Sequence, residues 1–223
     1  MKKERNKSRA VLFLAALPLI AVMWFVSQGA ALSAEETPAG PSAPAVQDDP
    51  YLILVNRAFA IGEAEFETAG VYGVIPAQKS NMRLNPTALE ALAELFAEAR
   101  ALGYTEFYLV SGFRDYAEQA MLYENAEDKS FVQPAGHSEH HTGLAADIAY
   151  LGESMYDFDQ SEYGQWFTAN AHRYGFILRY PADKTVLTGI SYEPWHFRYV
   201  GVSHATAMYE NNLCLEEYVN SLV

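Results

Sequence analysis

The sequence predicts an α+β domain in which a small antiparallel sheet is flanked by helices. Helical and strand patterns do not alternate regularly along the chain, which favours this class over a doubly wound parallel sheet. Half of the 223 residues are hydrophobic and 19% are charged, so the chain can form a full-sized core and is not of the disordered class. The single cysteine, Cys214, excludes an internal disulfide framework and a cysteine-based zinc ribbon.

The first predicted helix begins after Asn85 and ends at Gly103. Asparagine is a favoured N-cap, Pro86 suits the first turn, and glycine suits the position after a helix end. Between these signals, apolar residues recur at helical spacing at Leu89, Leu92, Phe96 and Ala99. A short apolar run at residues 107–110 is of strand type and is followed by a turn.

The remaining predicted elements lie towards the C-terminus. Asp115 is expected to cap a second helix that includes residues 117–124. Residues 158–174 contain a third helix, which Gly175 ends. Strands are predicted at residues 144–150, 176–178 and 195–200.

Residues 1–33 are expected to lie outside the folded domain, as a signal peptide or an N-terminal membrane anchor. Five basic residues among the first nine precede 17 uncharged residues, 10–26. A helix of that length spans roughly 25 Å, slightly less than the ~30 Å hydrocarbon core, and extension to Leu32 would cross it. Small residues at positions 31, 33 and 34 suit a signal peptidase. Both readings place the rest of the chain outside the cytoplasm, and a buried core helix is the remaining alternative.

Residues 34–50 are rich in proline, alanine and acidic residues and are predicted to form an extended linker, with the folded domain at residues 51–223. Without residues 1–33, which hold five basic and one acidic residue, the chain has 10 basic and 27 acidic residues, a net charge of −17. So acidic a domain would be repelled by nucleic acid phosphates and by anionic lipids. We therefore expect no nucleic-acid partner, membrane contact only through an uncleaved N-terminal segment, and a monomer.

The first of three segments with functional residue types is residues 138–147. His140 and Asp147 offer an imidazole and a carboxylate, which suit a cation such as zinc. Seven positions along a straight strand would put these side chains on opposite faces, so a shared site requires His140 in a loop and a bend at Gly143. Asp147 also lies in an apolar strand, where a metal would offset the cost of burying a carboxylate. A surface histidine cluster with a salt-bridged Asp147 is the alternative.

The second segment is Glu193, Pro194, Trp195 and His196. His196, at the start of a predicted strand, could supply a third ligand and leave a fourth position open for water, as in catalytic zinc sites. Glu193 can lie near the metal without binding it, which suits a general base, while Trp195 suits a wall of the site. The alternative is an ordinary strand with a proline at the sheet edge.

The third segment is residues 111–115, followed by Gln119. Arg114 comes directly after a predicted strand and before a predicted helix, so its side chain would project from a turn over a cleft. A guanidinium there can bind a ligand carboxylate through two donors or stabilise a developing oxyanion. Pairing of Arg114 with a surface acid is the alternative.

Together these segments resemble the VanX/VanY family of zinc D-alanyl-D-alanine peptidases. Ser138 to Asp147 follow the pattern S-x-H-x-x-G-x-A-x-D, residues 193–196 read E-P-W-H, and S-G-F-R begins at Ser111. The VanY-type carboxypeptidase branch, with its L,D-carboxypeptidase relatives, is the most similar in pattern. Residues 52–56 and 174–180 are similar as well, so the resemblance covers roughly residues 51–200.

The resemblance implies a set of roles for these residues. A zinc ion would be bound by His140, Asp147 and His196, with Glu193 as the catalytic base. Arg114 would contact the scissile carbonyl or the terminal carboxylate of the substrate, and Gln119, Ser138 and Trp195 would line the same pocket. The implied fold is the small α+β fold of the DD-peptidases, which the Hedgehog signalling domain shares.

Four further histidines have no motif role. His141 stands where relatives often carry glutamine, and we expect it to line the pocket at most. His137, His172 and His204 are expected to have structural or surface roles.

The implied function is that of a zinc-dependent D-alanyl-D-alanine carboxypeptidase, which removes the C-terminal D-alanine from peptidoglycan stem peptides outside the cytoplasm, either membrane-anchored or secreted to the cell wall. One alternative is an L,D-carboxypeptidase that acts on tetrapeptide stems. Another is a non-catalytic, zinc-containing cell-wall-binding module, although Glu193 beside a complete set of ligands argues against it.

Overall fold

The computed structural model describes residues 49–63 and 65–222. The predicted signal or anchor at residues 1–33 and nearly all of the predicted linker lie outside the described residues. Within the described ranges, no helix has the length and apolar character needed to cross a membrane. The elements in chain order are β1 (Ala69–Gly70), β2 (Arg83–Leu84), α1 (Pro86–Ala101), β3 (Phe107–Ser111), α2 (Tyr116–Asn125), η1 (Glu139–Thr142), β4 (Ala145–Tyr150), η2 (Met155–Gln160), α3 (Glu162–Asn170), η3 (Ala171–Tyr174), β5 (Phe176–Leu178), η4 (Ala182–Lys184), α4 (Thr185–Thr188), β6 (His196–Tyr199), α5 (Val202–Glu210) and α6 (Leu215–Ser221), where η denotes a 3₁₀ helix.

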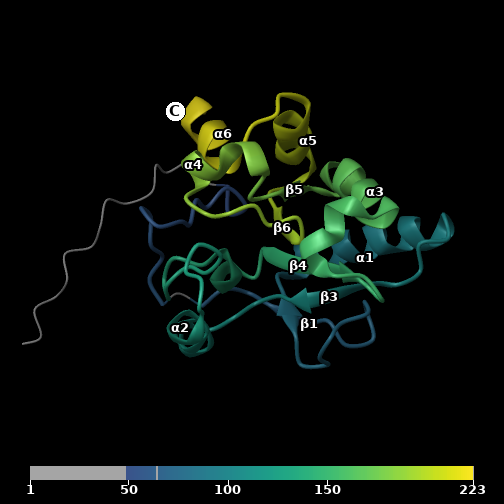
Figure 1. Cartoon of the computed structure of the whole chain (residues 1–223), viewed down its shortest axis with the longest axis horizontal. Coiled ribbons are helices and arrows are strands. Elements are labelled where there is room, and N and C mark those ends of the chain that lie inside the picture. The colour runs from purple at the N-terminus through teal and green to yellow at the C-terminus, as the bar shows by residue number, and fades with distance from the viewer. Residues whose placement is uncertain (1–48, 64, 223) are drawn as a thin grey trace, which may run out of the picture. The chain divides into compact units, whose positions relative to one another are not determined.

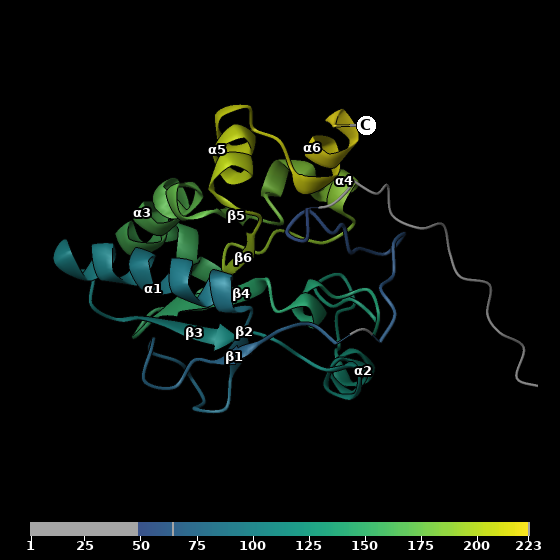
Figure 2. The same cartoon turned by 180° about the vertical axis from the view of Figure 1, so that it is seen from behind.

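A four-stranded sheet with the order β3-β4-β6-β5 forms the centre of the domain (Figure 1). All neighbouring strands in it are antiparallel, and β1 and β2 form a separate antiparallel pair. The helices α1 and α3 lie at one end of the domain, and α2 with its adjoining loops lies at the other (Figures 1 and 2). The predicted α+β class with a small antiparallel sheet is confirmed.

One face of this sheet is apolar and packs against α1 and α3. Because side chains alternate along a strand, Ile148 of β4 and Phe197 of β6 point to the same face. They join Leu92 and Phe96 of α1 and Phe167 of α3 in the main hydrophobic core. The side chains at the alternate positions, Asp147 of β4 and His196 and Arg198 of β6, therefore point away from this core.

The opposite face of the sheet carries charged and polar side chains. Asp147 and His196 are direct partners in the register of β4 and β6, and Arg198 is two residues after His196 on the same face. The 3₁₀ helix η1 covers this face, with all four of its residues buried. A polar layer is thus enclosed between the sheet and the loop that holds η1.

Local sequence signals start and end several helices as predicted. The Asn85 side chain accepts hydrogen bonds from the N–H groups of Thr87 and Ala88 at the start of α1, and Gly103 follows its end with φ = +95°. Asp115 forms a capping box with Glu118 at the start of α2.

The helices α5 and α6 had no predicted counterpart. Gly201, at the N-cap of α5, provides no side-chain cap, and α6 has a cysteine at its N-cap. Both helices are defined by tertiary packing. They enclose a second hydrophobic cluster with the segment after residue 51, formed by Leu52, Leu54, Ile177, Val200, Ala205, Met208, Leu215 and Val219.

Replacing Gly143, which ends η1, is expected to reduce stability for two reasons. Its φ of +71° costs an L-residue roughly 1–2 kcal/mol, and an added Cβ would lie 2.9 Å from Thr68 Cγ2 and 3.0 Å from Asn85 N. We therefore expect Gly143→Ala to lower the free energy of unfolding by more than this amount, as measured by urea denaturation.

Gly73→Ala is the matched control, because Gly73 has φ = +76° but nothing lies within 4 Å of its added Cβ. Gly73→Ala should lose only the free energy of unfolding that the positive φ costs an L-residue. Equal losses in the two variants would show that the close approach at Gly143 has no energetic consequence.

Candidate metal centre and active site

Three buried side chains converge on the polar face of the sheet. His140 of η1, Asp147 of β4 and His196 of β6 each offer one ligand atom, and these atoms lie within 4.8 Å of one another. The three residues come from three elements that the sheet and η1 bring together. The structure therefore assembles the predicted set of metal-ligating residues in one place.

The approach of His140 to the strands depends on the bend that the sequence requires. His140 lies in a 3₁₀ helix, and Gly143 reverses the chain with φ = +71° before β4 begins. His140 Nε2 is 3.4 Å from Asp147 Oδ2, while His196 Nδ1 is 3.0 Å from Asp147 Oδ1. Asp147 thus lies between the two imidazoles.

A backbone carbonyl fixes the orientation of the His140 ring. Its Nδ1 is 2.6 Å from the carbonyl oxygen of Gly112, which can only accept, so Nδ1 carries the proton. The Nε2 lone pair is then directed to the site. A second hydrogen bond of this kind is typical of metal-binding histidines.

The charges of these groups suit a divalent cation. Burial alone would raise the pKa of Asp147, but the imidazoles of His140 and His196 hold it well below its usual range, so Asp147 is ionised. Burial lowers the pKa of His140 to about 4, so its ring is neutral. Burial would also lower the pKa of His196, but the carboxylates of Asp147 and Glu139 raise it to about 9, so without metal this ring carries an extra proton that a bound cation would displace.

Asp147 Oδ1 is buried and has no well-directed hydrogen-bond donor among the described residues. Two imidazoles and one ionised carboxylate are the donor types of catalytic zinc sites that have three protein ligands. The residues present therefore fit a zinc ion.

Glu193 lies beside the three ligand residues without belonging to them. A turn at Pro194 and Trp195, closed by a hydrogen bond from His196 N to Glu193 O, carries it back over the site. Its Oε2 is 3.5 Å from His196 Nδ1. Burial raises the pKa of Glu193 to about 8, close to the value at which a general base works best near neutral pH.

Arg114 follows β3 and reaches the same site. Its Nε donates to Gln119 Oε1 at 2.9 Å, and its Nη1 donates to Ser111 Oγ at 2.8 Å. Nη1 is also 3.9 Å from Asp147 Oδ2, and 21% of the side chain is exposed. The hydrogen bonds of the guanidinium thus go to neutral side chains, Asp147 lies at a longer distance, and part of the side chain stays accessible.

The other predicted pocket residues differ in their placement. Ser138 and Trp195 line the cavity that contains the metal-ligating residues. Gln119 is fully buried and does not line it; its Nε2 donates to Gln133 O at 2.6 Å while its Oε1 holds Arg114. The structure therefore places Gln119 behind Arg114, as a support of the guanidinium.

The cavity itself has a volume of about 320 Å³. Arg114, Ser138, Glu193 and the three ligand residues line its base. Much of its wall is aromatic and consists of Phe131, Tyr156, Tyr180 and Trp195. Tyr156, which is largely exposed, and Trp195, which is buried, meet edge to face with ring centroids 4.8 Å apart, so an apolar surface lies next to the charged residues of the cavity.

The histidines without a motif role have structural contacts. His141 does not line this cavity: its ring stacks on Tyr116, its Nδ1 is 2.8 Å from Arg114 O, and its Nε2 accepts from Gly136 N. His137 contacts the Asn56 carbonyl. His172 stacks on a tyrosine, and His204 contacts Asp49 and Tyr218 near the surface.

Comparison with known proteins agrees with this arrangement. Residues 81–202 match the family described as VanY, D-alanyl-D-alanine carboxypeptidase, and this range contains every site residue discussed above. The chain belongs to the VanY family. The D-alanyl-D-alanine carboxypeptidase of Enterococcus faecium is 42% identical over 182 residues, which are 77% of this chain and 58% of that protein.

Solved structures of VanY-type enzymes share the fold. The LdcB LD-carboxypeptidase aligns with a TM-score of 0.70 at 34% identity, over 78% of this chain and 88% of that one. A variant of the vancomycin resistance D,D-pentapeptidase VanY, in complex with Zn(II), aligns with a TM-score of 0.63 at 35% identity, over 77% and 99% of the two chains. The chain spans between 52% and 66% of the length of the curated relatives that it matches.

Several residues of this VanY-family site have no role in the sequence prediction. Phe131 and Tyr156 lie outside the recognised motifs, and Tyr180 ends the similar segment 174–180 without an assigned role; the fold brings all three to the cavity. Glu139 occupies an unspecified position inside the first motif, next to His140, yet it is buried against His196. An acidic residue beside a histidine in the sequence gives no indication that it faces a different histidine.

A metal-binding experiment can distinguish the three ligand residues from the base Glu193. His140→Ala and Asp147→Ala should each remove most bound zinc, because each deletes a ligand atom, whereas Glu193→Ala should keep about one zinc per chain. Elemental analysis of the purified domain after dialysis gives the stoichiometry. Loss of zinc from Glu193→Ala alone would make Glu193 a ligand.

Proposed function

We propose that the domain is a zinc-dependent D-alanyl-D-alanine carboxypeptidase that removes the C-terminal D-alanine from peptidoglycan stem peptides. The observation that carries this proposal is the convergence of three ligand residues, a base with a raised pKa and a lone guanidinium in one cavity. Membership of the VanY family and the zinc complex of a relative support it. A metal-assisted hydrolysis of a peptide with a free carboxylate uses all of these parts.

His140, Asp147 and His196 would hold the zinc ion. When bound there, zinc lowers the pKa of a coordinated water and polarises a carbonyl oxygen. Glu193 accepts the proton of the attacking water and later donates it to the leaving amine of D-alanine. Burial favours the protonated form of this carboxyl group, which suits a group that must hold a proton between accepting and returning it.

Arg114 orients the substrate. Among the described residues that line the cavity, it is the only arginine or lysine. Since the chain is strongly acidic, a peptide with a terminal carboxylate needs a local positive group in order to approach. The guanidinium offers parallel donors that match a carboxylate or a developing oxyanion, and Ser111 and Gln119 keep it in place.

The same proposal also concerns where the protein acts and its oligomeric state. A stem peptide is reached outside the cytoplasm, with residues 1–33 as a secretion signal or as a membrane anchor. We expect a monomer whose partner is the peptidoglycan stem peptide.

An L,D-carboxypeptidase acting on tetrapeptide stems is the second candidate, and the similarity to the LdcB LD-carboxypeptidase favours it. A non-catalytic zinc-containing module that binds the cell wall is disfavoured, because Glu193 stands next to the complete ligand set.

Synthetic stem peptides distinguish these candidates. The purified zinc-loaded domain should release D-alanine from a pentapeptide that ends in D-alanyl-D-alanine faster than from the matching tetrapeptide. Glu193→Gln should reduce kcat by roughly 10²–10⁴ while zinc stays bound. Faster cleavage of the tetrapeptide would favour the L,D activity, and zinc binding without release from either peptide would favour the wall-binding module.

The role of Arg114 predicts a dependence on the substrate terminus. Amidation of the pentapeptide should sharply lower kcat/KM in the wild type, because it removes the negative charge that Arg114 binds. Arg114→Lys should lose roughly 2–4 kcal/mol of transition-state stabilisation on the free acid and should discriminate less between acid and amide. Equal cleavage of acid and amide by the wild type would point to an endopeptidase.

A further inference from the structure

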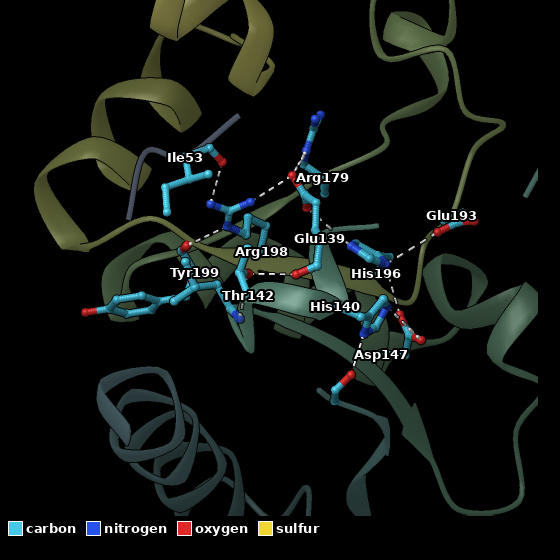
Figure 3. A network of polar contacts seen from close by, with 12 residues as sticks. Ile53, Glu139, His140, Thr142, Asp147, Arg179, Glu193, His196, Arg198 and Tyr199 are labelled. Atoms are coloured by element: carbon cyan, nitrogen blue, oxygen red, sulfur yellow. Dashed lines mark hydrogen bonds and ion pairs between the residues drawn. The ribbon is translucent and has the colours of Figure 1, made fainter. Parts of the chain in front are cut away.

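A buried ionic network lies directly behind the metal-ligating residues (Figure 3). Its centre is Glu139, whose side chain is completely buried. Glu139 Oε1 accepts from Arg179 Nε at 2.7 Å and from Arg198 Nη1 at 2.9 Å. Arg179 in turn makes a bidentate pair with Glu216 of α6, at 2.7 and 2.8 Å. Two carboxylates and two guanidinium groups thus balance in charge.

The second oxygen of Glu139 is not used by this network. Oε2 of Glu139 and Nε2 of His196 are both buried. Within the described ranges, neither atom has a hydrogen-bond partner. These two atoms lie 3.6 Å from each other. Figure 3 shows Glu139 on one side of the His196 ring, with Asp147 and Glu193 on the other. The ring therefore has one nitrogen towards the network and one towards the metal-ligating residues.

We propose that Glu139 is a positioning residue that holds His196 with Nε2–H towards the network and the Nδ1 lone pair towards the metal site. This inference rests on the proposed zinc-dependent function. An ionised carboxylate can only accept, so Glu139 Oε2 favours a proton on Nε2. Nδ1 faces Asp147 Oδ1 at 3.0 Å, and a cation bound between these two atoms would take the place of a proton on Nδ1 and leave the one on Nε2. Outer carboxylates that receive the second N–H of a histidine ligand orient the ring and raise its basicity.

Both guanidinium groups contribute by fixing Glu139 itself. Arg198 is anchored from three sides, since it also donates to the carbonyl oxygens of Tyr199, Tyr51 and Ile53. Arg179 is fixed by Glu216, which accepts a further hydrogen bond from Asn56 Nδ2. The carboxylate of Glu139 consequently has little freedom to follow a moving ring.

Glu139→Gln is the decisive variant because it preserves shape and reverses one hydrogen-bonding role. The amide oxygen must stay with the two guanidinium groups, which only donate, so the amide NH₂ replaces Oε2 and faces His196 Nε2. A donor there favours the proton on Nδ1, the atom that the metal needs. We expect zinc affinity, measured by competition with a chromophoric chelator, to fall by roughly 10–100-fold.

Glu216→Gln is the matched control, since it makes the same chemical change in the same network on the far side of Arg179. It should lower the melting temperature of the metal-free protein but leave zinc affinity within about twofold of the wild type. Glu139→Asp, which keeps an acceptor-only group, should retain more affinity than Glu139→Gln. Wild-type affinity in Glu139→Gln, or equal losses in Glu139→Gln and Glu216→Gln, would overturn the proposal.

A measurement on the wild type covers the case in which Glu139→Gln does not fold. With zinc bound, ¹⁵N-edited NMR of the His196 ring should show a slowly exchanging proton on Nε2 and none on Nδ1. A proton on Nδ1 of the zinc-bound ring would contradict the assignment. A wild type that binds no zinc would instead refute the proposed function, so the two failures are distinguishable.

Discussion

The pairing of Asp147 with His196 across β4 and β6 is the constraint on which the rest of the site depends. These residues are direct register partners in the middle of an antiparallel sheet, and both are almost completely buried. A shift of one residue in the register would turn Asp147 into the apolar core and Ile148 towards the metal site. The apolar face of the same strands prevents that shift, because Ile148 and Phe197 belong to the main core. The hydrophobic packing of one face therefore fixes the chemistry of the other.

The charged side chains on the buried face of the sheet require hydrogen-bond and ion-pair partners in the layer that covers them. Burial alone would raise the pKa of Glu139, yet Arg179 and Arg198 hold it well below its usual range, so the layer beneath η1 contains ionised groups. Each guanidinium donates to carboxylates or backbone carbonyls, which offsets the cost of removing it from water. The segment after residue 51 and the helix α6 supply several of these partners. Parts of the chain far from the motifs thus complete the site.

The sequence predicts the parts of this structure that local rules govern. Asn85, Asp115, Gly103 and Gly175 start or end helices as expected, because caps and left-handed glycines act on their immediate neighbours. The motif residues meet because the bend at Gly143 could be inferred from the spacing of His140 and Asp147. The role of Gln119 behind Arg114 could not be inferred, since a polar residue in a capped helix gives no indication of burial. The aromatic wall and the Glu139 network depend on contacts between residues far apart in the chain, from 37 residues for Arg179 and Glu216 to 160 for Asn56 and Glu216, which no local pattern records.

Stability alone does not account for the ionic layer. Replacing a buried ion pair by apolar residues of similar volume is often neutral or stabilising, whereas removing one partner is strongly destabilising. The stability of the fold therefore does not by itself require an ionic layer behind η1, since apolar groups would also close the sheet face. A hydrophobic layer could not, however, hold an imidazole ring in one protonation form, because apolar groups neither donate nor accept. The ionic layer ends on His196 Nε2, and its free acceptor faces that atom. Its position next to a ligand residue is thus the feature that a purely structural role leaves unexplained.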